Sequence, residues 1–172
     1  KTIKKIIFLS IFFLHQNSLL ADNPFYLDFK YVLNESAAGK QVQTFLKNKL
    51  DNGIKSLRDK EKKLQEEEKK IIQQKKVISA EEYKKKVTDL RSNVLSLQKE
   101  RDTLLENVSK QRAKARSELL KNLNPIMKNY MLEKNIRMII DKKSMLLADE
   151  NLNITDDIIK ILNTKLKSIK LN

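Results

Sequence analysis

Residues 71–90 read IIQQKKVISAEEYKKKVTDL, and this stretch decides the fold. Within it, Ser79 is followed three residues later by Glu82, which is the spacing of a helix capping box. In such a box the serine hydroxyl accepts a hydrogen bond from a backbone N–H of the first helical turn, so the helix starts there. We therefore predict that one helix ends near Ile78 and that another begins near Ala80.

Apolar residues recur in steps of four and three on both sides of this turn, which is the spacing of coiled-coil helices. If the two helices fold back on each other, the residue numbers of facing residues should add up to a nearly constant total. The four apolar pairs given below share one total, which defines a register. The same register places Glu61 opposite Arg101, which is a match of opposite charges. We predict an antiparallel helical hairpin arm over residues 41–119, with its tip near residues 79–81. The facing pairs are Ile78 with Tyr83, Ile71 with Leu90, Leu64 with Leu97, and Leu57 with Leu104.

Residues 22–40 and 120–172 flank the arm and are expected to form a small body. Their patterns predict three short strands, Phe25–Phe29, Ile136–Asp141 and Ser144–Asp149, the last two joined by a turn. The fold class is therefore α+β and mainly α. Three short strands make a marginal sheet, so the body should need sister subunits, whose strands could close together into a barrel.

Several residues mark the expected helix boundaries in the body. Asp28 and Ser36 are candidate N-caps, and Thr155 is expected to cap a terminal helix. Asn124 and Pro125 interrupt the second arm helix, because proline has no backbone N–H. We predict a kink or a restart with Asn124 as the cap, and we favour the kink over an ordinary loop because a helical apolar face continues beyond Pro125.

Residues 1–21 have the layout of a cleavable signal peptide. Lysines come first, a short apolar run follows over residues 6–14, and Ala21 offers a cleavage point. An uncleaved anchor or a buried first helix are the alternatives. Because the segment carries three lysines and no acids, its removal lowers the formal net charge from +14 to +11. A basic excess of this size points to anionic partners.

The composition argues against catalysis. His15 is the only histidine and lies in the expected signal peptide, and the chain has no cysteine, no tryptophan and two glycines. The usual general base, the thiol nucleophile, the common zinc ligands and a glycine-rich phosphate loop are all missing from the expected mature chain. We expect no catalytic residues, no metal site and no cofactor.

The order of elements resembles the Skp/OmpH family of periplasmic chaperones over roughly residues 24–167. The segments that carry the resemblance are Asn34–Lys40 (NESAAGK), Leu123–Ile126 (LNPI), Ile139–Asp141 (IID) and Thr155–Asp157 (TDD). The resemblance implies a homotrimer with a barrel body and three arms around a cavity. It also implies ATP-independent binding of unfolded outer-membrane proteins, which prevents their aggregation and assists their delivery for assembly.

The arm offers two sets of candidate client-binding residues. One set is apolar and lies off the hairpin seam, although such residues can also widen the seam or sit exposed singly. The other set is basic and could attract acidic segments, although a solvated helix face is the plainer interpretation. The apolar set is Ile72, Val77, Leu95 and Leu105, and the basic set is Lys84, Lys85, Lys86, Arg112, Lys114 and Arg116.

Other partners and functions remain open from the sequence. An anionic membrane surface is a possible partner of so basic a chain. A basic coiled coil can also bind nucleic acid through phosphates, but the chain lacks a reading motif and export would separate it from nucleic acid. A third alternative is a structural spacer in the cell envelope.

Overall fold

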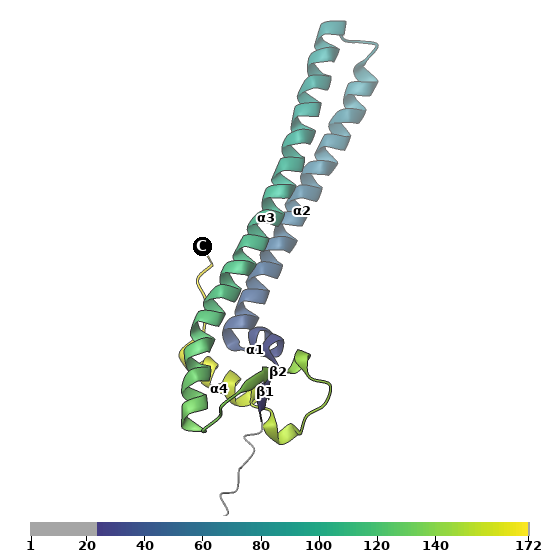
Figure 1. The fold of residues 1–172 in the computed structure, drawn as a ribbon. Coiled ribbons are helices and arrows are strands. Elements are labelled where there is room, and N and C mark those ends of the chain that lie inside the picture. The colour runs from purple at the N-terminus through teal and green to yellow at the C-terminus, as the bar shows by residue number, and fades with distance from the viewer. Residues whose placement is uncertain (1–23, 172) are drawn as a thin grey trace, which may run out of the picture.

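The computed structural model describes residues 24–171, so the expected signal peptide lies outside the described residues. Helices α2 (Ala37–Gln74) and α3 (Ala80–Glu133) run antiparallel and form a long arm above a small body (Figure 1). The body holds strands β1 (Phe25–Leu27) and β2 (Ile139–Asp141), the short helix α1 (Phe29–Glu35) and the terminal helix α4 (Thr155–Lys165). The predicted hairpin arm is confirmed.

The tip of the arm is built around the expected cap. The hydroxyl of Ser79 accepts a hydrogen bond from the backbone N–H of Glu82 at 3.1 Å, which starts α3 at Ala80. The expected end of the first helix at Ile78 is wrong, because α2 ends at Gln74. The carbonyl oxygen of Gln74 accepts from the N–H groups of both Val77 and Ile78, and these bonds close a turn that carries the chain across to α3.

The seam of the arm is narrow, as its sequence predicts. Leu57, Ile71 and Val108 are buried along it. The guanidinium of Arg101 lies 4.0 Å from the carboxylate of Glu61, so the predicted charge match is present. Both side chains of this pair are about half exposed, and such pairs stabilise a fold only weakly, by about 0–1 kcal/mol.

The sheet of the body differs from the expectation. β1 and β2 pair in parallel, with Phe25 opposite Ile139, and the described residues contain a sheet of two strands. The predicted third strand, Ser144–Asp149, is wrong. Ser144 ends a single turn of 3₁₀ helix, Lys142–Ser144, and residues 145–149 lie between it and a second such turn, Glu150–Leu152.

Side chains that bond to the backbone explain the missing strand. Asp141 Oδ1 accepts from the N–H of Lys143, and Asp149 Oδ1 accepts from the N–H of Asn151. Aspartate in this role favours turns over extended ladders. Asp28 acts in the same way on the N–H of Tyr31, so β1 ends at Leu27 and α1 begins where a longer strand was expected.

Two further boundaries depart from the sequence prediction. Thr155 is the first residue of α4 and does not cap it; its hydroxyl instead accepts from the backbone N–H of Asp28 at 2.9 Å. α3 continues through Pro125, so a restart with Asn124 as the cap is also wrong. Leu123 and Ile126 are almost fully buried on either side of the proline, and this burial offsets the backbone bond that proline removes.

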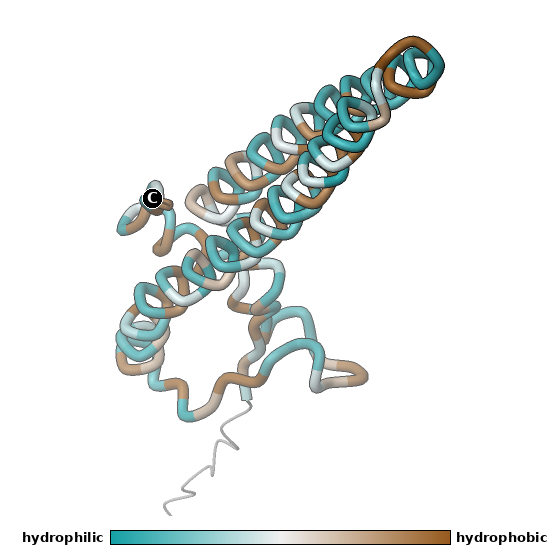
Figure 2. The backbone as a smooth tube through the Cα atoms, turned by 90° about the horizontal axis from the view of Figure 1, so that it is seen from above, coloured by the Kyte–Doolittle hydropathy of each residue, from teal (hydrophilic) through white to brown (hydrophobic). Residues whose placement is uncertain are grey.

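One core joins the body to the base of the arm. The C-terminal helix α4 packs on α1 and α3, and Ile169 and Leu171 beyond it are also buried. The lower part of α3 bends from the line of the arm toward this core (Figure 1). Away from the core, hydrophilic and hydrophobic positions alternate along the arm, and hydrophobic positions reappear at its free end (Figure 2). The most deeply buried side chains are Leu27, Val32, Ser36, Leu123, Ile126, Ile158 and Leu162.

Candidate functional site

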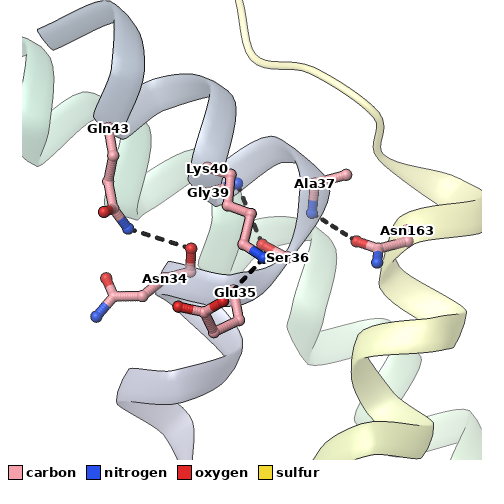
Figure 3. A network of polar contacts seen from close by, with 8 residues as sticks. All are labelled: Asn34, Glu35, Ser36, Ala37, Gly39, Lys40, Gln43 and Asn163. Atoms are coloured by element: carbon pink, nitrogen blue, oxygen red, sulfur yellow. Dashed lines mark hydrogen bonds and ion pairs between the residues drawn. The ribbon is translucent and has the colours of Figure 1, made fainter.

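The elbow between α1 and α2 fixes the base of the arm to the body (Figure 3). The fully buried Ser36 caps α2 by accepting from the N–H of Gly39 at 3.2 Å. Asn163 of α4 accepts from the N–H of Ala37 at 2.7 Å, so α4 holds a second free donor of the same helix end. The first turn of a helix leaves its N–H groups without partners, and both bonds satisfy such groups.

Two more contacts close the elbow from the outside. The Nζ atom of Lys40 lies 2.9 Å from Glu35, and the side-chain amide of Gln43 donates to the carbonyl oxygen of Asn34 at 3.1 Å (Figure 3). The hydrogen bond with Glu35 raises the pKa of Lys40. The NESAAGK segment of the sequence therefore has a structural role: it sets the direction in which the arm leaves the body.

The four apolar side chains proposed for client binding are all exposed. Val77 at the tip is 82% exposed and Leu95 on α3 is 72% exposed, while Ile72 and Leu105 are exposed to a lesser degree. None of them widens the seam. The structure spreads them over the arm instead of gathering them into one patch.

The basic candidates divide into two groups. Lys84, Lys85 and Lys86 follow the tip, where Lys86 bonds to Gln74 at 3.0 Å and therefore helps to join the two helices. The other group lies near the base of the arm. There Arg112 and Arg116 line one groove, whereas Lys114 lines a small hollow on another side of α3.

The groove with Arg112 and Arg116 has a volume of about 930 Å³. It is bounded by α1, α2, α3 and the end of β2, where Asp141 and Lys143 line it. Its floor is mostly apolar and its rim is mostly basic. The floor includes Phe29, Leu33, Val42, Leu46, Leu50 and Leu119, and the rim includes Lys30, Lys47, Arg112, Arg116 and Lys143.

Sequence reasoning missed most of this groove. Lys30 and Lys47 lie on α1 and α2, far in sequence from Arg112, and neither belongs to a basic run that would mark a site. Only the hairpin register and the elbow bring these residues to one place. The register was predictable, but the fold-back of α1 beside α2 was not.

Residues 24–171 were also searched for metal sites and for membrane-spanning helices. They contain no group of histidine, cysteine or carboxylate side chains that could hold a metal ion. None of the helices in this part of the chain has the length and apolar character needed to cross a bilayer.

A long, antiparallel helical hairpin on a small strand-containing body defines a class of arm-bearing proteins, and comparison with known proteins identifies the family. The family model for outer membrane protein (OmpH-like) matches residues 25–162, and the chain belongs to this family.

Solved structures agree with this fold. A crystal structure of an OmpH-like protein from Caulobacter crescentus CB15, assigned as an outer membrane chaperone, superposes with a TM-score of 0.80. The match covers 87% of this chain and 90% of that chain, at 19% sequence identity. A search of curated proteins found no significant match.

Proposed function

We propose that this protein is a periplasmic holdase chaperone, which binds unfolded outer-membrane proteins without ATP and assists their delivery for assembly. The observation that carries the proposal is the surface of the arm. Large apolar side chains stand exposed along a thin, strongly charged hairpin, in a chain of formal net charge +14. Family membership supports a chaperone role.

The proposed mechanism relies on many weak contacts. An unfolded barrel protein exposes apolar strands and aggregates through them. Scattered apolar side chains can each cover a small part of such a strand, and several contacts acting together give affinity while the client stays mobile. Basic side chains would draw in acidic segments over longer distances. Release then requires only a more stable folding site in the membrane.

The proposed assembly is a homotrimer. Leu146 and Leu147, in the segment expected to be a third strand, are almost completely exposed, and Met138 beside β2 is more than half exposed. A sheet of two three-residue strands is too small to be stable by itself. Sister subunits could cover these leucines and extend the sheet around a shared barrel, with the arms enclosing a cavity.

Export to the periplasm is the remaining part of the proposal. It rests on the signal-peptide layout of residues 1–21. Fractionation of cells that express the full chain tests it, with Edman sequencing of the recovered protein. We expect a periplasmic product that begins at Asp22. Recovery in the cytoplasm with the first 21 residues intact would contradict export.

An aggregation assay tests the function directly. A urea-unfolded outer-membrane barrel protein is diluted into buffer without nucleotide, with and without residues 22–172 of this chain, and light scattering is followed. We expect scattering to be suppressed and the client to remain soluble. A folded, oligomeric sample that leaves the scattering unchanged would contradict the proposal and favour a structural spacer.

A further inference from the structure

The charged residues on the rim of the groove at the base of the arm, called the basal groove from here on, are mostly basic. Asp141 is the one acidic residue of the lining, and it lies 3.3 Å from Lys143. Within residues 24–171, no carboxylate lies within ion-pair distance of the four other basic rim residues. These are Lys30, Lys47, Arg112 and Arg116.

The groove is poor in acidic residues, whereas glutamates are frequent farther along α2. Elsewhere on the arm, Lys60, Lys86 and Lys110 each pair with a glutamate. The four cations are exposed, and Phe29, Leu33 and Leu50 of the floor are partly exposed to water. An occupant that carries both carboxylates and apolar side chains would pair with the cations and cover these apolar side chains at once.

The shape of the groove fits a short stretch of extended chain. On α2 its lining runs from Gly39 to Leu50, which at 1.5 Å per residue is about 16 Å. About five residues of an extended chain, at about 3.3 Å each, span that length. The volume of about 930 Å³ lies within the usual range for binding sites.

The positions of the cations favour a peptide over other occupants. Lys30 and Lys143 belong to the body, whereas Lys47 and Arg112 lie farther along the arm. An anionic lipid would need its cations gathered around one head group.

We propose that the basal groove docks a short, extended segment of an unfolded polypeptide in which carboxylate side chains alternate with apolar ones. Alternation suits an extended chain, because successive side chains point to opposite faces and meet the rim and the floor separately. This inference rests on the proposed chaperone function and gives that function a defined contact point at the base of the arm.

The test uses the full mature chain and a fluorescein-labelled ten-residue peptide of alternating glutamate and leucine, with binding measured by fluorescence anisotropy. The groove variant carries Lys30→Gln, Lys47→Gln, Arg112→Gln and Arg116→Gln. The matched control removes the same charge from exposed arm lysines that do not line the groove. Its changes are Lys55→Gln, Lys62→Gln, Lys69→Gln and Lys99→Gln.

We expect the wild-type chain to bind the acidic peptide and not a peptide with lysine in place of glutamate. The groove variant should bind at least tenfold more weakly, and the control variant no more than about threefold more weakly, because distant exposed charges are screened by salt. Equal losses in the two variants, or no binding by the wild type, would overturn the proposal.

A position-specific probe distinguishes the groove from the rest of the arm. The chain contains no cysteine, so Thr44→Cys in the groove lining and Ser92→Cys on the outer arm each give one labelling point. A dye at residue 44 should change its emission when the peptide binds, and a dye at residue 92 should not. A change at residue 92 alone would place the peptide elsewhere and overturn the proposal.

The remaining outcomes separate this inference from the function on which it rests. If the chain binds phosphatidylglycerol vesicles in place of the peptide, the groove is assigned to a lipid. If the groove variant changes its oligomer mass while its peptide affinity is unchanged, the groove is assigned to a sister subunit. Each result overturns the peptide proposal. If the wild-type chain still suppresses client aggregation in that case, the chaperone function stands without the groove.

Discussion

The carbonyl oxygen of Leu33 lies so close to Gly39 that a Cβ atom on Gly39 would stand 2.0 Å from it. Only a residue without a side chain permits this approach of α1 to α2. We predict that Gly39→Ala lowers the free energy of unfolding by about 1–3 kcal/mol, because the backbone at the elbow must shift. Urea denaturation followed by circular dichroism measures the change.

Gly53→Ala is the matched control. A Cβ atom at Gly53 would meet the end of the Leu104 side chain at 2.4 Å, and a side chain can rotate where a backbone carbonyl cannot. Alanine also gains about 1 kcal/mol over glycine in a helix. We expect this variant to change stability much less than Gly39→Ala. Equal destabilisation by the two changes would contradict the special role of the elbow.

Tyr130 links the base of α3 to α4 and makes the free energy of unfolding fall at alkaline pH. Its hydroxyl donates to Asp157 at 2.8 Å, and burial, followed by this hydrogen bond, raises the pKa of Tyr130 to about 12. The folded state then holds the proton more tightly than the unfolded state, whose tyrosine pKa is about 10. The stability that this proton provides is therefore full below about pH 10 and is lost as the pH rises toward 12.

Tyr130→Phe removes both the bond and the titration. We expect the variant to be less stable by about 1 kcal/mol at neutral pH and to lose less stability than the wild type between about pH 10 and 12. Urea denaturation curves across that pH range give the comparison. Parallel losses in the two proteins would show that other groups control the alkaline transition.

Electrostatic capture of clients should depend on the basic set proposed from the sequence. We predict that changing all six residues to glutamine weakens binding of an acidic client at low salt by about tenfold. The difference should disappear near 1 M salt, where the Debye length is about 3 Å. Unchanged capture at low salt would remove electrostatics from the mechanism. The six changes are Lys84→Gln, Lys85→Gln, Lys86→Gln, Arg112→Gln, Lys114→Gln and Arg116→Gln.

The exposed apolar residues of the arm should affect capture and leave folding unchanged. We predict that Ile72→Gln, Val77→Gln, Leu95→Gln and Leu105→Gln together alter stability by less than about 1 kcal/mol, because these side chains are exposed. The fourfold variant should suppress aggregation of the client several-fold less well than the wild type does. As a contrast, Leu64→Gln at the half-buried seam should destabilise the arm itself. If the fourfold variant suppresses aggregation as well as wild type, these side chains are not client contacts.

Assembly should depend on the exposed leucines of the body. We predict that Leu146→Ser with Leu147→Ser reduces the mass measured by light scattering from trimer toward monomer. Leu132→Ser is the matched control, since Leu132 is also exposed but belongs to the last turn of α3. A trimer that is unaffected by the double change, or one that Leu132→Ser disrupts equally, would show that the sheet edge is not the interface.

The sequence predicted the arm well because its signals are local and repeated. The heptad spacing fixes which faces meet, and the Ser79 cap fixes where the chain turns, so the contact of Glu61 with Arg101 could be anticipated. The body was harder to predict, because a short apolar run forms a strand only when a partner strand is present. Leu146 and Leu147 belong to such a run and have no partner strand within the described chain.

The candidate site could be predicted only in part, for the same reason. The off-seam position of Leu95 follows from the helical period, and its exposure agrees with it, whereas Val77 is exposed because it lies in the turn beyond α2. The basal groove depends on the close approach of Leu33 to Gly39 and on the bond from α4 to Ala37, which are contacts between distant segments. No short pattern in the sequence encodes such contacts.

Native mass spectrometry of residues 22–172, mixed with an unfolded outer-membrane barrel protein in the absence of nucleotide, is the most direct measurement. We expect a complex with the mass of three copies of this chain and one client. A stable, folded monomer that forms no complex with the client would contradict the central claim that sister subunits join their bodies and hold the client between their arms.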